Sequence, residues 1–178
     1  MKRHGIPHHM CTVTLGIHKD YKNNAYYANN FDESAERINR IFKEASAKGV
    51  HVEKRSVSLE EIIDHLKSKL IVICLLDAML LECCWCDTFR RSCLCCFKIC
   101  PKLYQGHFVV VCGYDCDKKL IFYKNPGIHQ ELCCSRWDQF DNARKSFGTD
   151  EDILFIDEKS LHYTKPLTDE DIDNLNIS

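Results

Sequence analysis

The chain has 178 residues, enough for one domain with a sizeable core, and 45% of them are hydrophobic, as in an ordinary globular protein. The formal net charge of -2 argues against a general nucleic-acid-binding protein, whose domain would be strongly basic. The longest apolar run, Leu70–Leu81, is shorter than the roughly 20 residues of a membrane-spanning helix. The basic start MKRHGIPHH lacks the apolar region of a signal peptide, so we expect the protein in the cytoplasm or the nucleus.

The first third of the chain is predicted to hold one helix and one strand. Residues 1–31 are rich in turn-forming residues and predict irregular structure. A helix is predicted from Glu33 to Lys48, because its apolar residues recur on one face and a glycine follows its end. Val50–Val57 alternates apolar and polar residues, which predicts a half-buried strand.

The middle of the chain predicts a second helix and three strands. Ser58 and Glu61 form a capping box at the start of the helix. Leu70–Leu76 is apolar throughout and predicts a central strand covered on both faces. His107–Tyr114 and Leu120–Lys124 are separated by a short polar turn, which predicts an antiparallel hairpin.

The last third predicts a helix, a strand and a polar tail. Ser135 and Asp138 form a second capping-box pattern before a helix that ends near Gly148. Asp152–Ile156 predicts a final strand, and residues 157–178 are acidic and without periodicity, so we expect them to be disordered. Together these elements predict an α+β domain at residues 1–156, with an antiparallel sheet and flanking helices.

A cysteine-rich insertion occupies residues 83–103 and holds seven of the thirteen cysteines. Two C-x-x-C pairs, which are Cys83 with Cys86 and Cys93 with Cys96, have spacings that suit a tetrahedral structural zinc site. Redox-active thiols are a second interpretation, since the odd number of cysteines argues against a full disulfide scaffold. S-palmitoylation is a third, because basic residues next to the cysteines would favour peripheral contact with an anionic membrane.

The hairpin carries candidate catalytic residues at one end. His107 stands at the start of one strand, and Asn125 follows the end of the next. In an antiparallel pair the start of one strand lies beside the end of its neighbour, so both side chains could meet at one edge of the sheet. A histidine base oriented by an asparagine is an arrangement that cysteine hydrolases use. A histidine at a strand end is more often without any catalytic role.

Three stretches resemble the guanylyl cyclase domain-containing protein family: CTVTLGIHKDYKNNAYYANNFD, YQGHFVVVCGYDCDKKLIFYKNPG and ARKSFGTDEDILFI. The resemblance extends from about Lys2 to Ile156. It implies a papain-like fold of the C39 peptidase type, in which the catalytic order is cysteine, histidine, then aspartate or asparagine. His107 matches the histidine and Asn125 the third residue.

The chain departs from the family's pattern at the nucleophile. The resemblance implies a cysteine far upstream, in a tryptophan-aspartate-cysteine-glycine motif at the start of a helix, and this sequence has no such motif. We therefore expect an N-terminally incomplete papain-like domain, inactive as a hydrolase, as in a truncated isoform. An exposed apolar sheet surface would then promote oligomerisation.

The sequence is compatible with two further functions. One is a non-catalytic interaction module with a protein partner and a zinc-stapled loop. The other is a guanylyl cyclase that makes cyclic GMP from GTP, which the family's name implies. Asp115 and Asp117 could hold a metal ion for that reaction, but they stand in a predicted turn, where aspartate is common for conformational reasons.

Overall fold

A computed structural model describes residues 5–23, 31–85, 104–127 and 132–157 of the chain. Its elements are, in chain order, β1 (His8–Thr12), the 3-10 helix η2 (Lys19–Asn23), α1 (Phe31–Glu44), β2 (His51–Lys54), α2 (Leu59–Lys67), β3 (Val72–Asp77), β4 (Gly106–Asp115), β5 (Leu120–Lys124), β6 (Cys133–Arg136), α5 (Trp137–Arg144) and β7 (Ile153–Ile156). The predicted cysteine-rich insertion and acidic tail lie outside the described residues, apart from their first residues.

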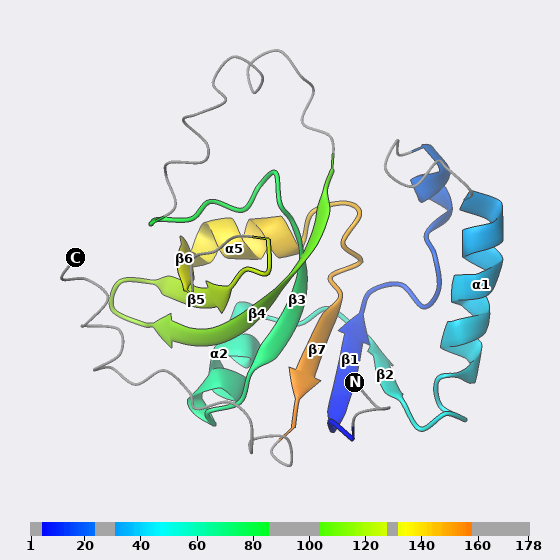
Figure 1. Ribbon diagram of the computed structural model, residues 1–178, viewed down its shortest axis with the longest axis horizontal. Coiled ribbons are helices and arrows are strands. Elements are labelled where there is room, and N and C mark those ends of the chain that lie inside the picture. The colour runs from blue at the N-terminus through cyan, green and yellow to red at the C-terminus, as the bar shows by residue number, and fades with distance from the viewer. Residues whose placement is uncertain (1–4, 24–30, 86–103, 128–131, 158–178) are drawn as a thin grey trace.

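The described strands form one seven-stranded sheet in the order β2-β1-β7-β3-β4-β5-β6 (Figure 1). β1 and β2 pair in parallel, and the other neighbours pair antiparallel. The expected α+β class is therefore confirmed, whereas the expected wholly antiparallel sheet is wrong at one edge. A parallel pair needs a long crossover, and α1 lies in the connection between β1 and β2.

The main hydrophobic core lies between one face of the sheet and the helices α2 and α5. Side chains alternate between the two faces of a strand, so one set from each strand points to this core. Ile62, Ile63 and Leu66 supply the buried face of α2, and Phe140 and Ala143 supply that of α5. They pack against a set of sheet residues: Cys11, Val72, Cys74, Leu76, Val109, Val111, Ile121, Tyr123, Cys133, Ile153 and Phe155.

The opposite face of the sheet is less covered in the described part of the chain. Its buried cluster consists of Phe122, Leu132 and Cys134, with Trp85 packed against it. Ile73 and Leu75 are only half-buried there, and Phe108 is 48% exposed. The prediction that β3 is covered on both faces is therefore wrong for the described residues.

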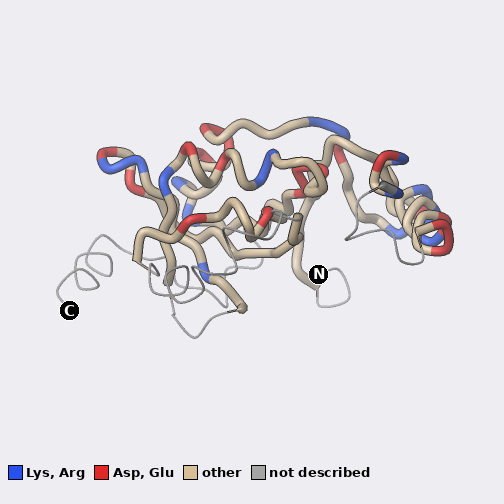
Figure 2. The backbone as a smooth tube through the Cα atoms, turned by 90° about the horizontal axis from the view of Figure 1, so that it is seen from above, with Lys and Arg blue, Asp and Glu red and all other residues tan. Residues whose placement is uncertain are grey.

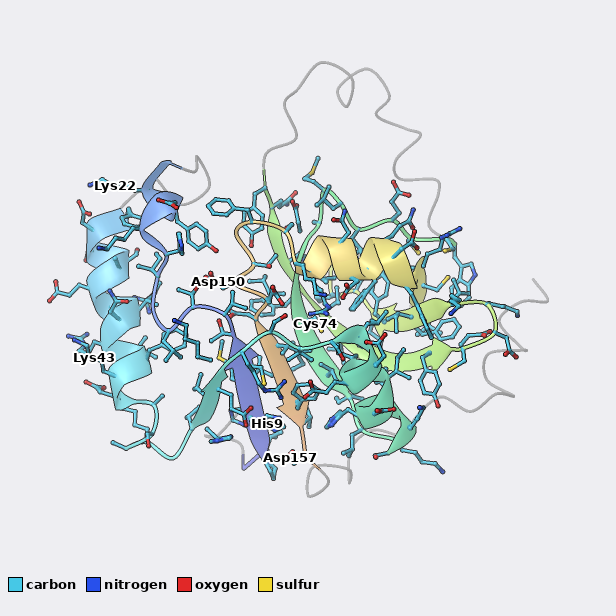
Figure 3. The ribbon with its side chains drawn as sticks, turned by 180° about the vertical axis from the view of Figure 1, so that it is seen from behind. His9, Lys22, Lys43, Cys74, Asp150 and Asp157 are labelled. Carbon is cyan, nitrogen blue, oxygen red and sulfur yellow. The ribbon has the colours of Figure 1, made fainter. Side chains whose placement is uncertain are left out.

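Helix α1 lies at one end of the molecule and contributes no buried residue to the core (Figure 2). The helix is amphipathic as predicted, yet Ile41 on its apolar face is 48% exposed. Polar contacts attach it to the rest of the chain: Asn39 Oδ1 accepts from the Ile17 amide at 3.2 Å, and Lys22 lies 3.5 Å from Asp32. Lys22 and Lys43 are labelled on this side of the molecule in Figure 3.

Two strands arise where the sequence predicts something else. β1 lies inside the segment expected to be irregular, and it pairs with β2 on one side and β7 on the other. At its start, His9 lies 3.6 Å from Asp157, the residue that follows β7 (Figure 3). β6 includes Ser135, which is fully buried in the strand and does not cap α5. The residue before α5 is Arg136, which makes no side-chain capping bond.

One of the two hydrogen bonds of the predicted capping box forms at the start of α2. The Ser58 side chain accepts a hydrogen bond from the Glu61 amide at 3.1 Å, as the pattern predicts. The Glu61 carboxylate instead accepts two hydrogen bonds from the Arg55 guanidinium, at 2.6 and 2.8 Å. None of the helices in the described ranges is both long and apolar enough to cross a membrane.

Candidate functional site

His107 and Asn125 meet at one end of the β4–β5 hairpin. Val109, Val111 and Tyr123 face the main core, and alternation along β4 puts His107 on the same face, at its edge. His107 Nε2 lies 2.7 Å from Asn125 Oδ1, and both residues are half-buried. The predicted contact therefore forms, while a catalytic role for the two residues remains a prediction.

The hydrogen bonds around Asn125 define the tautomer of His107. Asn125 Oδ1 also accepts the Gly127 amide at 2.9 Å, and a backbone N–H can only donate. The same oxygen faces His107, so Nε2 must carry the proton that it donates. In a neutral imidazole the other nitrogen, Nδ1, then has a lone pair and can accept a proton. This is the orientation that a general base requires.

The turn before β4 is held by a buried carboxylate. Asp77, at the end of β3, is 7% exposed, and its Oδ1 accepts the amides of Met79 and Gln105 at 3.0 and 3.2 Å. Ala78 N donates to Gln105 O at 2.8 Å, which ties the ends of β3 and β4 together. Because Gln105 is two residues before His107, these bonds fix the point at which the histidine enters the sheet.

A glycine on a distant segment makes room beside this turn. Gly148 has φ +112, a region that favours glycine, and a methyl group built on it would lie 2.9 Å from the Tyr104 ring. Tyr104 is 9% exposed and precedes β4. The GTDED segment that begins at Gly148 therefore packs directly against the segment that leads to His107.

Three cysteines of the described ranges are poor nucleophiles. Burial raises the pKa of Cys11 and Cys112 to about 11 and that of Cys74 to about 12. A thiol must lose its proton to attack, so these three stay inactive near neutral pH. Among the described residues, no hydrogen bond joins His107 to a cysteine.

The predicted zinc ligands fall mostly outside the described residues. Cys83 packs against the main core, whereas Cys86, Cys93 and Cys96 lie in the range that the structure does not describe. Within the described ranges, no three histidine, cysteine, aspartate or glutamate side chains are placed to hold a metal ion. The zinc site stays a prediction.

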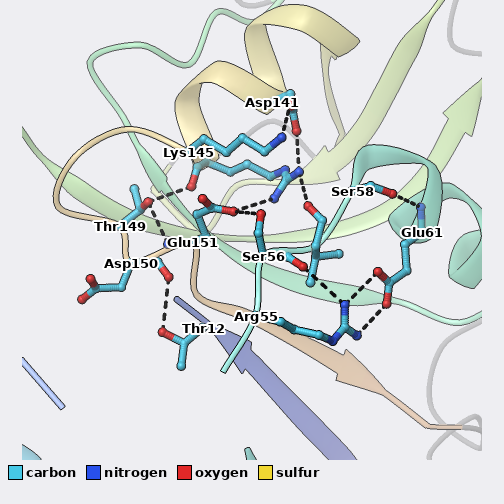
Figure 4. Close-up of polar contacts among 12 residues, drawn as sticks. Thr12, Arg55, Ser56, Ser58, Glu61, Asp141, Lys145, Thr149, Asp150 and Glu151 are labelled. Atoms are coloured by element: carbon cyan, nitrogen blue, oxygen red, sulfur yellow. Dashed lines mark hydrogen bonds and ion pairs between the residues drawn. The ribbon is translucent and has the colours of Figure 1, made fainter. Parts of the chain in front are cut away.

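A buried ion cluster, centred on Arg144, was not predicted from the sequence; its acidic partners Asp141 and Glu151 are labelled in Figure 4. Arg144 is 2% exposed and donates to the Val57 carbonyl at 2.6 Å. Its guanidinium forms ion pairs with Asp141 at 2.5 Å and with Glu151 at 3.9 Å. The cluster connects α5, the start of α2 and the turn before β7. An arginine on a helix that otherwise buries apolar residues gives no local signal of this role.

The turn before β7 has an unusual backbone. Asp150 and Glu151 have φ of 49 and 51, in the left-handed region that costs most non-glycine residues free energy. Several bonds hold the turn in place: Tyr21 donates to Asp150 Oδ1 at 2.7 Å, and Thr149 Oγ1 donates to Arg144 O at 2.7 Å. The turn thereby joins η2, α5 and β7.

Asp152 is the titratable residue of this turn with the clearest perturbation. Burial raises its pKa, a hydrogen bond from Thr12 opposes the shift and the Asp150 charge adds to it, so that the pKa is about 6. Among the described residues, its buried Oδ1 has no hydrogen-bond partner. Burial without full compensation favours the neutral acid.

Comparison with known proteins assigns the chain to a family. The sequence model of a protein family described as guanylylate cyclase matches residues 1–156 of the chain. The chain is similar to guanylyl cyclase 1 of Arabidopsis thaliana, with 34% identity over 154 residues, which cover 84% of this chain and 54% of the relative. The chain thus spans about half the length of that curated relative. No solved structure matches it, so the papain-like fold stays a prediction. The matched range contains both the His107–Asn125 pair and the Arg144 cluster, and the chain belongs to the guanylylate cyclase family.

Proposed function

We propose that this chain is a cysteine-hydrolase-like domain in which His107 is the base and Asn125 its orienting residue. The observation that carries the proposal is the 2.7 Å contact between His107 Nε2 and Asn125 Oδ1, at one edge of the sheet. The contact leaves Nδ1 as a proton acceptor on a half-buried ring. In cysteine hydrolases that nitrogen takes the proton of the thiol and later returns it to the leaving group.

We expect the proposed site to be inactive as far as the described residues go, because Cys11, Cys74 and Cys112 keep their protons near neutral pH. Their pKa values lie well above neutrality, and a general base acts only on a group within hydrogen-bonding reach. The base and its orienting residue would then be retained without hydrolysis. A thiol that reaches Nδ1 of His107 would complete the site.

Mapping of thiol reactivity tests this proposal. The purified chain would be treated with a small alkylating agent from pH 5 to 9, and the rate at each cysteine measured by peptide mass spectrometry. We expect every rate to fall towards low pH, with the same profile in His107→Ala. His51→Ala is the matched control, because His51 is an exposed histidine on the edge strand β2.

One result would contradict the expectation that the proposed site is inactive. A cysteine that stays reactive near pH 6 in the wild type, loses that reactivity in His107→Ala and keeps it in His51→Ala would be the nucleophile. The chain would then be an active hydrolase, and peptide substrates would be the next experiment. A change in all rates together would show only a general effect on folding, which circular dichroism of the same variants would detect.

Guanylyl cyclase activity is the second candidate, and the description of the family and the name of the Arabidopsis relative favour it. The described residues offer it little support. Asp115 Oδ1 accepts the Lys118 amide at 2.8 Å, so this carboxylate is used in the β4–β5 turn. Cyclases of the common class need carboxylates that hold metal ions at the triphosphate.

Incubation of the purified chain with GTP and Mg²⁺ or Mn²⁺ separates the two candidates. Mass spectrometry would detect cyclic GMP directly, and isothermal titration would detect binding of GTP. Cyclic GMP that forms in the wild type and in His107→Ala alike would establish a cyclase whose chemistry does not use the proposed base. Absence of both binding and product would exclude the cyclase and favour the hydrolase-like site of these two candidates.

The interaction module with a zinc-stapled loop is the third candidate. The start of the insertion is attached to the core through Cys83, so a metal ion held by the insertion would be coupled to the folded domain. Elemental analysis of the purified chain would show about one zinc per chain if the predicted tetrahedral site exists. Cys83→Ser with Cys93→Ser should release that zinc, and His107→Ala should retain it.

A further inference from the structure

Two pairs of adjacent cysteines come together where the cysteine-rich insertion begins. Cys83 and Cys84 stand at its start, and Cys133 and Cys134 lie in the edge strand β6. The Cys84 amide donates to the Cys134 carbonyl at 2.8 Å. The side chains are close enough to interact: burial raises the pKa of Cys134, and the neighbouring Cys84 thiol raises it as well. A backbone hydrogen bond thus joins two cysteines that are far apart in sequence.

The backbone contact brings the two residues close in space. The bond from the Cys84 amide to the Cys134 carbonyl is 2.8 Å long, and residues of antiparallel strands that exchange two such bonds have Cα atoms about 5.5 Å apart. Disulfide-linked residues have Cα atoms between about 4.4 and 6.8 Å apart. A bond between the two sulfurs would therefore need rotation of side chains and little movement of the backbone.

The two thiols differ in access to solvent. Cys84 is exposed, whereas Cys134 is fully buried in the small cluster with Phe122. Next to Cys84, the Trp85 ring lies 5.6 Å from the Phe122 ring and covers the same cluster. An accessible thiol beside a second, protected thiol is the arrangement in which the first reacts with an oxidant and the second resolves the product.

We propose that Cys84 and Cys134 form a reversible disulfide, with a small-molecule disulfide such as oxidised glutathione as the oxidant. The Cys84 thiolate attacks one sulfur of glutathione disulfide, forms a mixed disulfide and releases one glutathione. Cys134 then loses its proton and attacks the Cys84 sulfur, and the second glutathione leaves as a thiolate that takes up the proton. Two cysteine thiols are oxidised, and one glutathione disulfide is reduced to two glutathiones.

The disulfide would fix the start of the insertion to the outermost strand of the sheet. β6 pairs only with β5 among the described strands, and Cys84, at the start of the insertion, bonds to Cys134 in β6. Oxidation would add a covalent link to the backbone hydrogen bond that joins the two residues there. The inference does not depend on the role of His107, which lies in β4, so either proposal can fail without the other.

Peptide mapping of the oxidised full-length chain tests the proposal. The chain would be incubated with oxidised glutathione and a metal chelator, its remaining thiols alkylated, and its peptides identified by mass spectrometry. We expect a peptide that links Cys84 to Cys134, with the loss of about 2 Da that one disulfide causes. Dithiothreitol should reverse the loss. The chelator prevents a metal ion in the insertion from protecting Cys84.

Matched variants make the result specific. Cys84→Ser and Cys134→Ala should each abolish the linked peptide, and Cys134→Ala should leave glutathione attached to Cys84. Cys116→Ser removes an exposed cysteine in the β4–β5 turn and should leave the linked peptide unchanged. A disulfide from Cys84 to a cysteine of the insertion would overturn the proposal. So would a stable mixed disulfide on Cys84 in the wild type, because Cys134 would then not resolve it.

Discussion

Arg144 and His107 are both polar residues at the border of the main core, and they have opposite surroundings. Arg144 is 2% exposed, donates to a buried carbonyl and is paired with two carboxylates. His107 is half-buried and uses one ring nitrogen, bonded to Asn125, while the other nitrogen keeps a lone pair. The first arrangement surrounds a buried charge with partners from three segments, and the second leaves one ring nitrogen outside the bond to Asn125.

This difference distinguishes polar residues that stabilise the fold from polar residues that could take part in a reaction. A buried charge with several partners is expensive to disturb, because removal of one partner leaves the others uncompensated. Disturbing a half-exposed pair lowers the free energy of unfolding only slightly, because water replaces the lost hydrogen bond. The same disturbance changes which ring nitrogen of His107 carries the proton. Stability measurements should therefore respond strongly at Arg144, and measurements of protonation should respond at His107.

The largest expected effect is the loss of stability in Arg144→Met. The variant removes the charge that balances Asp141 and Glu151, and we expect the free energy of unfolding to fall by about 3–5 kcal/mol. Urea unfolding followed by circular dichroism would measure it. Lys145→Met is the control, since Lys145 lies 2.9 Å from the same Asp141 but is 40% exposed, and should cost at most about 1 kcal/mol. Equal losses in the two variants would contradict the structural role of Arg144.

A smaller effect, which depends on pH, is expected for Asp152→Asn. Burial raises the native pKa of Asp152 from 3.8 to about 6, so its contribution to stability is complete below about pH 4 and is lost as the pH rises through 6. An asparagine does not ionise there, so the variant should be more stable than the wild type at pH 7.5, by up to roughly 3 kcal/mol. At pH 4 the two should be similar.

Asp138→Asn is the control for that prediction. Asp138 is fully exposed, and the Arg136 guanidinium holds its pKa below the ordinary value. Its ionisation is therefore complete well below pH 5, and the substitution should not alter how stability changes between pH 5 and 7.5. A gain in Asp138→Asn equal to that in Asp152→Asn would mean that overall charge, and not burial of one carboxyl, sets the pH dependence.

The smallest effect on stability is expected at the site itself. Asn125→Ala removes one hydrogen bond to a half-exposed ring, so it should cost about 1 kcal/mol or less. Nitrogen NMR of His107 should nevertheless change clearly, because the Nε2–H tautomer loses the acceptor that fixes it. Asn125→Asp retains an acceptor and should keep that tautomer. Persistence of the Nε2–H tautomer in Asn125→Ala would show that Asn125 does not orient the ring.

Local sequence determined the elements whose signals lie within a few residues. The hairpin of β4 and β5 follows from two apolar strands around a short polar turn, and its register brings His107 to Asn125. The start of α2 follows from Ser58, whose side chain can satisfy only a nearby amide. These features needed no knowledge of distant partners, and the candidate catalytic pair could therefore be predicted from the sequence.

Long-range pairing decided the rest. β1 has little apolar alternation of its own, and it is a strand because β2 and β7 supply its hydrogen bonds. Ser135 resembles a helix cap in sequence, but pairing with β5 makes it a buried strand residue. The burial of Arg144 depends on Val57, Asp141 and Glu151, which come from three segments. Sequence alone determined where side chains could bond locally, whereas tertiary structure decided which distant groups they meet, because burial and pairing depend on chain segments that no local pattern encodes.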